Sequence, residues 1–292
     1  MVNCILRSYV HRTDYAGVLS LVGRRGNRPY ITDLDEKLHI PQIRRDCRVW
    51  VTPDGRICGL VLVDDYQNLC LDADDDLDFT ALLDEALPWA WNVAQQNFAE
   101  QALDACEYSD SLRLPILLQK GFIETGLRTY RYVFQPAGHV PEAVVPEGFT
   151  IRPLRGEGEV SAWMDLHLAA HPDAQLDRAY RLAMMSAARY RPELDWVMQS
   201  PSADLVAYCV GSLEAQPDGS LVGYTDPVAV HPSWHGKGLG KAIMCFCMDQ
   251  LLKTGAASLE VGTSSGNIAM QRLAESVGFE IAEEKVWLRL EK

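Results

Sequence analysis

The feature that most constrains the fold is a pattern of elements that occurs twice along the 292 residues. Each half begins with a short strand and a helix start, continues with two strands around a polar turn, and closes with Gly-Phe and an alternating strand. The matching segments are 5–22 with 151–167, 49–65 with 195–214, and 117–134 with 273–290. A repeat of this kind predicts two domains built on one plan.

The two halves join near residues 135–148, a stretch with three prolines and little periodicity. This composition is typical of a linker. We therefore predict an N-terminal domain over residues 1–136 and a C-terminal domain over residues 147–292. The expected fold class is α/β, of the α+β type, with a central mixed β-sheet flanked by helices in each domain.

Charge and cysteine usage narrow the function. The formal net charge is -13, which argues against nucleic acid as a partner and favours a cationic small molecule. The eight cysteines form no Cys-x-x-Cys pair and mostly lie in apolar runs, as expected of buried thiols in a reduced compartment. No apolar window has the length of a membrane span, and the N-terminus has no cleavage pattern. We expect a cytoplasmic protein without a membrane partner.

The most informative short stretch runs from residue 221 to residue 255. LVGYTDPVAV reads as a strand, interrupted or bulged at Pro227 because proline cannot donate a ladder hydrogen bond. HPSWHGKGLG follows as a turn. The apolar spacing then predicts a helix that begins at Lys241 and ends at Gly255.

Three glycines at a strand-to-helix turn suit an anion. Glycine lets the backbone approach a ligand, and the first helical turn has unpaired amides. The glycine turn and the start of the helix together are therefore suited to bind a phosphate. Lys237 and Lys241 would add positive charge. The spacing is neither that of a Walker loop nor that of a dinucleotide turn. Taken alone, it would equally fit a tight turn without a ligand.

The context of this turn resembles the acyl-CoA loop of the GNAT superfamily of N-acetyltransferases. The matching residues are Val230-His231-Pro232 and His235-Gly236-Lys237-Gly238-Leu239-Gly240. A second family motif follows at the family's distance, with Asn267 opening a helix that leads to Gly278-Phe279. The resemblance covers residues 148–292 well and residues 1–136 only by pattern.

The resemblance implies a fold in which strands four and five of the C-terminal domain splay apart around acetyl-CoA. It also implies acetyl transfer to a primary amine, of a small molecule in our interpretation, by direct attack in a ternary complex, with no metal. The pantetheine arm would pair with Val228, Ala229 and Val230. The pyrophosphate would lie on the turn, and Asn267 would contact the cofactor beyond the splay. The implied turn residues are His235, Gly236, Lys237, Gly238, Leu239, Gly240 and Lys241.

The sequence departs from the family at two positions. His235 stands where the family has Arg or Gln, so we expect weaker or pH-sensitive pyrophosphate binding. Ala274 stands where the family often has the tyrosine that protonates the leaving thiolate. Since a thiol is a good leaving group, water or another side chain could supply that proton.

The general base is chosen between two carboxylates, and a tyrosine is the candidate acid. Asp226 is the carboxylate nearest the cofactor segment, and Tyr224 lies two residues earlier on the same strand face. We interpret Asp226 as the base and Tyr224 as the acid, with Glu260 on the neighbouring strand as a second candidate base. Asp226 accepting a hydrogen bond at the bulge is the structural alternative.

Two further polar clusters have weaker functional patterns. His167 and His171 share a helix face but lack the glutamate of a metalloprotease pair, so contact with the acceptor fits better than a metal. Residues 72–78 contain five aspartates, without the glycine and glutamate of a calcium loop. This acidic segment occupies the place of the phosphate turn in the first half, where it would repel a pyrophosphate. We predict that the N-terminal domain does not bind CoA in the family manner and instead covers the acceptor pocket.

Three readings of the function stay open. The tandem plan resembles that of the mycothiol synthase family, which implies an amine on a sugar-like or thiol-containing acceptor. The strand-four carboxylate of that family corresponds to Gly223 or Tyr224 here, and neither residue is a carboxylate. The first alternative is a non-catalytic acyl-CoA-binding or sensing protein. The second is an acetyltransferase that acts on a protein or peptide amine.

Overall fold

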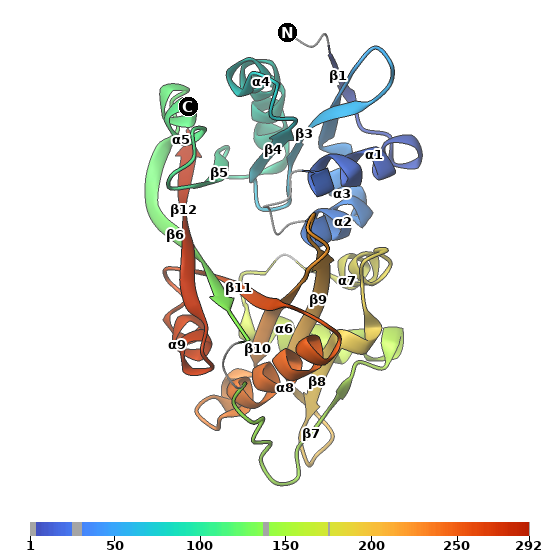
Figure 1. Cartoon of the computed structure of the whole chain (residues 1–292), viewed down its shortest axis with the longest axis vertical. Coiled ribbons are helices and arrows are strands. Elements are labelled where there is room, and N and C mark those ends of the chain that lie inside the picture. Colours follow the sequence, from blue (N-terminus) through green and yellow to red (C-terminus); the bar gives the residue numbers. More distant parts are fainter. Residues whose placement is uncertain (1–3, 25–30, 137–139, 175, 292) are drawn as a thin grey trace. The chain divides into compact units, whose positions relative to one another are not determined.

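The computed structural model describes all residues except 1–3, 25–30, 137–139, 175 and 292 (Figure 1). The chain forms two compact units. Unit 1 comprises Met1–Thr129 and Glu283–Lys292, and unit 2 comprises Tyr130–Ala282. The division between the units therefore falls inside two strands, near residues 129 and 282. Part of the predicted linker and the first three residues lie outside the described residues, and the sequence-based division stays a prediction.

Unit 1 contains a four-stranded antiparallel sheet in the order β1-β2-β3-β4. Helices α1 and α4 contact this sheet. The elements are β1 (Ile5–Ser8), α1 (His11–Arg24), α2 (Ile31–His39), α3 (Pro41–Arg45), β2 (Cys47–Val51), β3 (Ile57–Val63), β4 (Leu69–Ala73), α4 (Phe79–Asn97), β5 (Leu103–Tyr108), α5 (Leu114–Gln119) and β6 (Ile123–Phe134).

Strand β5 belongs to a second set of strands in unit 1. It pairs antiparallel with β12 (Glu280–Leu290), from Lys285 opposite Tyr108 to Leu290 opposite Leu103. Asn68, which immediately precedes β4, forms an isolated parallel bridge with Asp104 of β5, and in the described part of the chain no ladder continues from it between the two strands. Strands four and five of unit 1 therefore diverge, a feature that we predicted only for the C-terminal half.

Unit 2 contains a mixed sheet in the order β6-β11-β10-β9-β8-β7. Within this sheet, β7 to β10 pair antiparallel and β10 pairs parallel with β11. The elements are β7 (Thr150–Pro153), η1 (Gly156–Glu159), α6 (Val160–Ala170), α7 (Arg178–Met185), η2 (Pro192–Leu194), β8 (Asp195–Gln199), β9 (Leu205–Ala215), β10 (Leu221–Val230), η3 (Pro232–Trp234), α8 (Leu239–Lys253), β11 (Ser258–Ser264), α9 (Ile268–Ser276) and β12.

The centre of this sheet has the two irregularities that the sequence predicted. The register between β9 and β10 shifts between Thr225 and Val228, which places a bulge at Pro227. The parallel register of β10 and β11 runs from Val222–Ser258 to Tyr224–Glu260, although both strands continue beyond it. The expected splay of strands four and five is therefore present in unit 2.

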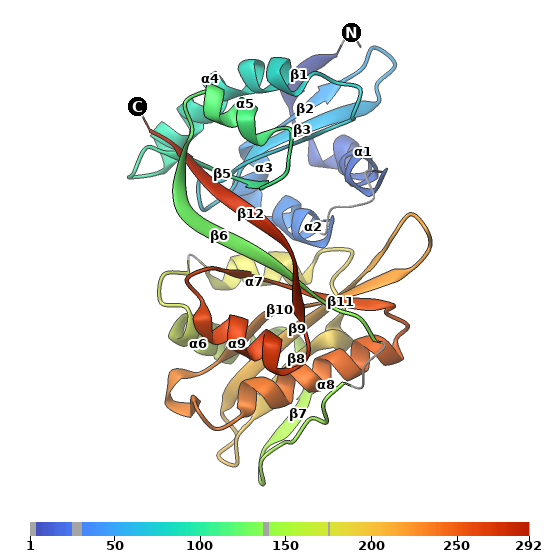
Figure 2. The same cartoon turned by 60° about the vertical axis from the view of Figure 1, so that its left-hand side comes forward.

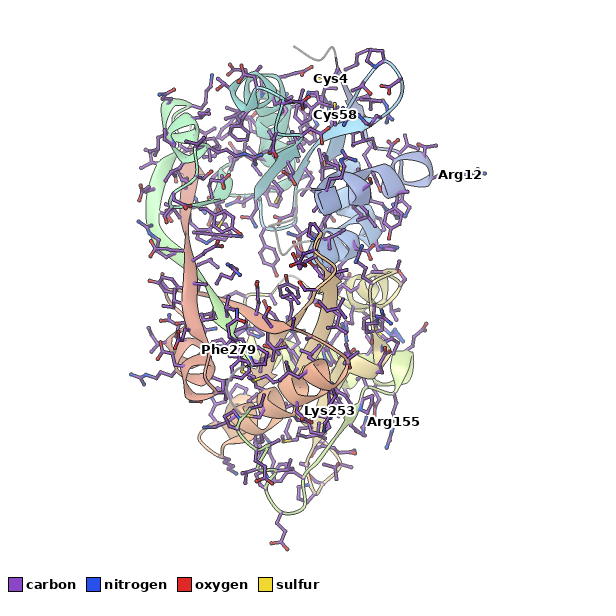
Figure 3. All side chains as sticks on the ribbon, viewed as in Figure 1. Cys4, Arg12, Cys58, Arg155, Lys253 and Phe279 are labelled. Atoms are coloured by element: carbon purple, nitrogen blue, oxygen red, sulfur yellow. The ribbon has the colours of Figure 1, made fainter. Side chains whose placement is uncertain are left out.

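The two faces of the unit 2 sheet are covered by different helices. Figure 2 shows α8 lying across β8, β9 and β10, and its buried side chains join the main core of the unit. Phe279, labelled in Figure 3, packs in the same core against Phe134, with ring centroids 5.8 Å apart. Trp163 and Leu166 of α6 pack on the opposite face. The predicted fold class, with sheets flanked by helices, is confirmed: the sheet of unit 2 is mixed, whereas β1 to β4 of unit 1 pair antiparallel.

Candidate cofactor and acceptor site

The turn between β10 and α8 is open at its two central glycines. Gly236 and Gly238 have positive φ angles of 75° and 78°, a conformation that L side chains rarely adopt. A β-carbon added at either position would meet no atom within 4 Å. These glycines are therefore required by the backbone of the turn, and they leave free space beside it.

The amino end of α8 carries no side-chain cap. The helix begins at Leu239, two residues earlier than predicted, and its N-cap is Gly238. Since glycine has no side chain to accept from the first amides, these N–H groups and the positive end of the helix dipole stay available to an external anion. Gly240 serves packing instead, because an added β-carbon would lie 3.4 Å from Val230 Cγ2.

The two lysines of the turn have different partners. The Lys237 ammonium lies 4.3 Å from the ring centroid of Trp234 in η3. The Lys241 ammonium donates to the backbone carbonyl of Ser276, at 3.0 Å. Lys241 therefore ties α8 to the end of α9, and Lys237 is the lysine that lies along the turn itself.

The histidine at the family's arginine position folds back on the strand. His235 Nε2 donates to the carbonyl of Val230 at 2.9 Å. This contact closes the turn onto the end of β10. The side chain thus stabilises the shape of the turn.

The second motif organises the loop between β11 and α9. Asn267 is the N-cap of α9, and its Oδ1 accepts from the amide of Met270 at 3.1 Å. Gln271 holds the same loop by donating to the carbonyls of Ser264 and Ser265. Ala274, at the family's tyrosine position, is fully buried in the core of unit 2. Its methyl group therefore packs in the core.

Asp226 and Tyr224 lie on the sheet face opposite α8. The neighbouring Gly223 faces α8, since an added β-carbon would contact Leu251 and Leu259, so the alternation of the strand turns Tyr224 the other way. Asp226 is exposed, and its Oδ2 lies 4.0 Å from the β-carbon position of Gly262 on β11. The carboxylate therefore reaches across the gap where β10 and β11 separate.

Glu260, the second candidate base, is engaged in an ion pair. It lies opposite Tyr224 in the parallel register, and its carboxylate is 2.5 Å from a guanidinium nitrogen of Arg131 on β6. Both side chains of the pair are largely shielded from solvent. This arrangement gives Glu260 a structural role in fixing β6 beside β11.

A tyrosine–histidine pair lies on the same face and was not found by sequence reasoning. Tyr208 on β9 is opposite Ala229, and its hydroxyl shares a hydrogen bond of 2.8 Å with Nδ1 of His167. Burial raises the pKa of Tyr208, and the charge of Asp226 raises it further. Burial, together with His171 and Arg181, lowers the pKa of His167 to about 4. Both side chains are therefore uncharged at neutral pH, close to the Asp226 carboxylate.

His171 is the C-cap of α6, and its ring centroid lies 5.0 Å from that of His167. The shared helix face predicted for these two histidines is therefore confirmed. Within the part of the chain that the structure describes, no group of His, Cys, Asp and Glu has an arrangement suited to a metal ion. None of the described helices combines the length and apolarity needed to cross a membrane.

The corresponding turn of unit 1 is built from aspartates. Residues 74–78 connect β4 to α4, and Asp78 caps the helix by accepting from the amide of Thr80 at 2.9 Å. Asp74 pairs with the guanidinium groups of Arg24 and Arg56. One of the first amides of α4, that of Thr80, is thus satisfied by the chain itself, beside negative charge.

The comparisons with known proteins agree with this geometry. Residues 160–279 match the model of the acetyltransferase (GNAT) family. A mycothiol acetyltransferase of Salinispora tropica is 26% identical over 148 residues, which are 48% of this chain and 47% of that protein. One of Thermomonospora curvata is 28% identical over 152 residues, with the same two shares. The chain thus spans about half the length of these curated relatives.

Solved structures extend the likeness in fold to the whole chain. A GCN5-related N-acetyltransferase from Sphaerobacter thermophilus has a TM-score of 0.69 at 18% identity, over 99% of this chain and 95% of that one. A tandem GNAT protein from the clavulanic acid biosynthesis pathway has a TM-score of 0.70 at 16% identity, over 99% and 98%. The chain therefore has the fold of tandem GNAT proteins.

Proposed function

We propose that this protein is an acetyl-CoA-dependent N-acetyltransferase that moves an acetyl group to the primary amine of a small molecule. The observation that carries the proposal is the open glycine turn at the uncapped amino end of α8, beside the gap between β10 and β11. The match of residues 160–279 to an acetyltransferase family supports it.

The residues present fit acetyl-CoA as a co-substrate. The amides of residues 236–241 would hold the diphosphate, because Gly236 and Gly238 leave open space and no side chain caps α8. The edge of β10 at residues 228–230 would pair with the pantetheine arm where β11 diverges. Lys237 would add positive charge beside the turn, and Asn267 would contact the cofactor from the amino end of α9.

The side chains on the other sheet face would move the protons. An ammonium has no lone pair, so the acceptor amine must lose a proton before its nitrogen attacks the thioester carbonyl carbon. We assign that proton to Asp226, directly or through water, because its exposed carboxylate reaches into the strand gap. The C–N bond forms, the C–S bond breaks, and the thiolate leaves with a proton from Tyr224 or from water.

The acceptor is proposed from the relatives and from charge. The curated relatives are named mycothiol acetyltransferase, so an amine on a sugar-linked, thiol-containing compound is the first acceptor to test. The formal net charge of -13 favours a cationic substrate over an anionic one. A cytoplasmic location is part of the same proposal.

One observation favours a second function, acyl-CoA binding without turnover. Ala274 is fully buried, so the position of the family's tyrosine has become part of the core. A protein that had lost its acid could still bind acyl-CoA through backbone groups.

Release of CoA from acetyl-CoA, measured with a thiol reagent across a panel of amines, separates the two functions. The transferase predicts CoA release that rises with the concentration of at least one amine, and an acetylated amine detected by mass spectrometry. Binding of acetyl-CoA with no amine-dependent release in any member of the panel would support the second function.

A further inference from the structure

A cavity of about 350 Å³ lies inside unit 1, where β4 and β5 diverge beyond the Asn68–Asp104 bridge. Its wall is formed by both strands together with residues of α2, α4 and β12, and every lining residue belongs to unit 1. Cavities of this size hold small ligands in many proteins. The function proposed above makes no use of it.

Three features distinguish this cavity from a site for acyl-CoA. The adjoining turn, residues 74–78, is acidic. Asp78 already caps α4, so the helix offers no open anion site. Arg113 donates to the carbonyl of Leu71 at 3.1 Å, which occupies the edge of β4 that a pantetheine arm would need. A ligand without a phosphate is therefore required.

Most of the wall is apolar. Its apolar side chains include those of Leu60, Leu62, Leu69, Leu71, Leu83 and Trp287. Water in such a space gains little from its neighbours, and an apolar molecule that displaces it is stabilised by the hydrophobic effect. The body of the ligand should accordingly be apolar.

One buried carboxylate in the wall stands apart from the others. Glu107 on β5 is 7% exposed, and one of its oxygens accepts from the amide of Tyr108 at 3.1 Å. In the described part of the chain it forms no ion pair. By contrast, Asp33 and Asp64 of the same wall both pair with Lys37. A buried carboxylate is unfavourable without a cation or further donors.

The charged side chains of the cavity wall sum to a net negative charge, which has the same sign as the Glu107 carboxylate. Four carboxylates line the cavity, from Asp33, Asp64, Asp72 and Glu107, against three cationic side chains, from Lys37, Arg113 and Lys285. Arg113 lies 3.7 Å from Asp72, and the Lys285 ammonium lies over the ring of Tyr108. A positively charged ligand is favoured over a negatively charged one.

We propose that this cavity binds a small primary amine with a mainly apolar body, and that its ammonium group pairs with the Glu107 carboxylate. The cavity is a second ligand site, in the unit that carries no glycine turn. The proposal stands on the wall of unit 1 alone and does not depend on acetyl transfer by unit 2.

Calorimetric titration with three probes that share a skeleton tests the proposal. The probes are 3-phenylpropylamine, 3-phenylpropanol and 3-phenylpropionic acid, which at pH 7 are a cation, a neutral molecule and an anion. We expect the amine to bind at one site, the alcohol more weakly, and the acid not at all. Equal binding of acid and amine would contradict the proposal, and so would the absence of amine binding.

Two substitutions locate the site. Glu107→Gln keeps the shape and removes the charge, so amine affinity should fall about tenfold or more while alcohol affinity is unchanged. Asp110→Asn, an exposed residue of the same unit outside the cavity wall, is the matched control and should bind like the wild type. An unchanged affinity in Glu107→Gln would overturn the assignment of the ammonium.

Two thiols in the wall give a readout on the wild-type chain, which serves if Glu107→Gln fails to fold. Burial raises the pKa of Cys70 to about 12 and that of Cys106 to about 11, so iodoacetamide should modify both slowly. The amine should slow the modification of both further and leave that of Cys4, which does not line the cavity, unchanged. Equal rates with and without amine would place its binding elsewhere.

The Gly238→Asp variant separates this proposal from the proposed function. It alters the turn of unit 2, so amine binding at the cavity should persist in it even if acetyl-CoA binding is lost. Loss of both would mean that the amine binds at the acceptor site of unit 2, which would overturn the proposal.

Discussion

The two strand-to-helix turns, residues 74–78 in unit 1 and 231–238 in unit 2, occupy the same place in the same order of elements. The first is acidic and caps its own helix through Asp78. The second has Gly236 and Gly238 at positive φ and leaves the amino end of its helix without a side-chain cap. One fold can thus repel or attract an anion at the same position, and a handful of turn residues decides which.

The strand gaps beside these turns differ in the same way: the gap of unit 2 suits CoA, and that of unit 1 does not. In unit 2 the edge of β10 at residues 228–230 continues past the last pair with β11. In unit 1 the carbonyl of Leu71 on β4 is occupied by Arg113. The gap of unit 1 borders a cavity with a mainly apolar wall that also carries buried charged groups, whereas that of unit 2 keeps the features of a thioester site.

The largest expected effect concerns the side chain at the mouth of the unit 2 gap. Asp226→Asn should lower kcat by about a hundredfold, because the amide cannot accept the proton of the acceptor amine. Its affinity for acetyl-CoA should stay unchanged. Steady-state kinetics with the best amine of the panel measures both. Asp218→Asn, in an exposed turn, is the control, and a wild-type kcat in Asp226→Asn would remove Asp226 from the mechanism.

The next effect concerns the position where unit 2 departs from its family. Ala274→Tyr should lower the free energy of unfolding by about 1–3 kcal/mol, because a large side chain is forced into a packed core. It should not raise the rate of CoA release. Urea denaturation measures the first, and Ala269→Tyr, exposed on the same helix, should be nearly neutral. A stable and faster Ala274→Tyr enzyme would show that the site can still accept the family's acid.

A smaller effect is expected in the acidic turn of unit 1. Asp78→Ala should cost about 1 kcal/mol of stability through the lost N-cap of α4. Asp76→Ala, exposed in the same turn, should cost less. Denaturation of both variants makes the comparison. A second CoA site in Asp78→Ala would contradict this account. It would mean that the side-chain cap alone prevents unit 1 from binding CoA, and that the other aspartates of the turn have no effect.

The last effect is a pH dependence of stability from His167. Its pKa in the folded protein, about 4, is below the ordinary value of 6.5, so between these pH values the unfolded chain binds a proton that the folded chain does not. The free energy of unfolding should therefore fall as the pH falls through this window. Denaturation at pH 7.5 and pH 5 should show a smaller loss for His167→Gln than for the wild type. An equal loss would assign the effect to other groups.

Much of the fold could be predicted because it depends on local signals. The glycines, the prolines and the spacing of apolar residues predicted the succession of β10, α8, β11 and α9, although α8 begins two residues before the predicted Lys241. The bulge at Pro227 followed from a missing backbone donor. The acidic turn of unit 1 was found for the same reason, since its charge is visible in seven consecutive letters.

The contacts that complete the candidate site could not be predicted because they join strands that are distant in sequence. Tyr208 lies in an apolar run and looks like a core residue until the register places it beside Ala229 and His167. Arg131 reaches Glu260 across 129 residues. Glu107 stands between Cys106 and Tyr108 in the sequence, and only the divergence of β4 and β5 places it in the wall of a cavity.

Calorimetric titration of acetyl-CoA into the wild type, Gly238→Asp and Gly219→Asp tests the central claim most directly. Gly219 also has a positive φ and open space at its β-carbon, but lies in an exposed turn away from the glycine turn, so it controls for backbone strain. The account predicts one site per chain, lost or weakened at least a hundredfold in Gly238→Asp and retained in Gly219→Asp. Two sites in the wild type, or full affinity in Gly238→Asp, would contradict the contrast between the two turns.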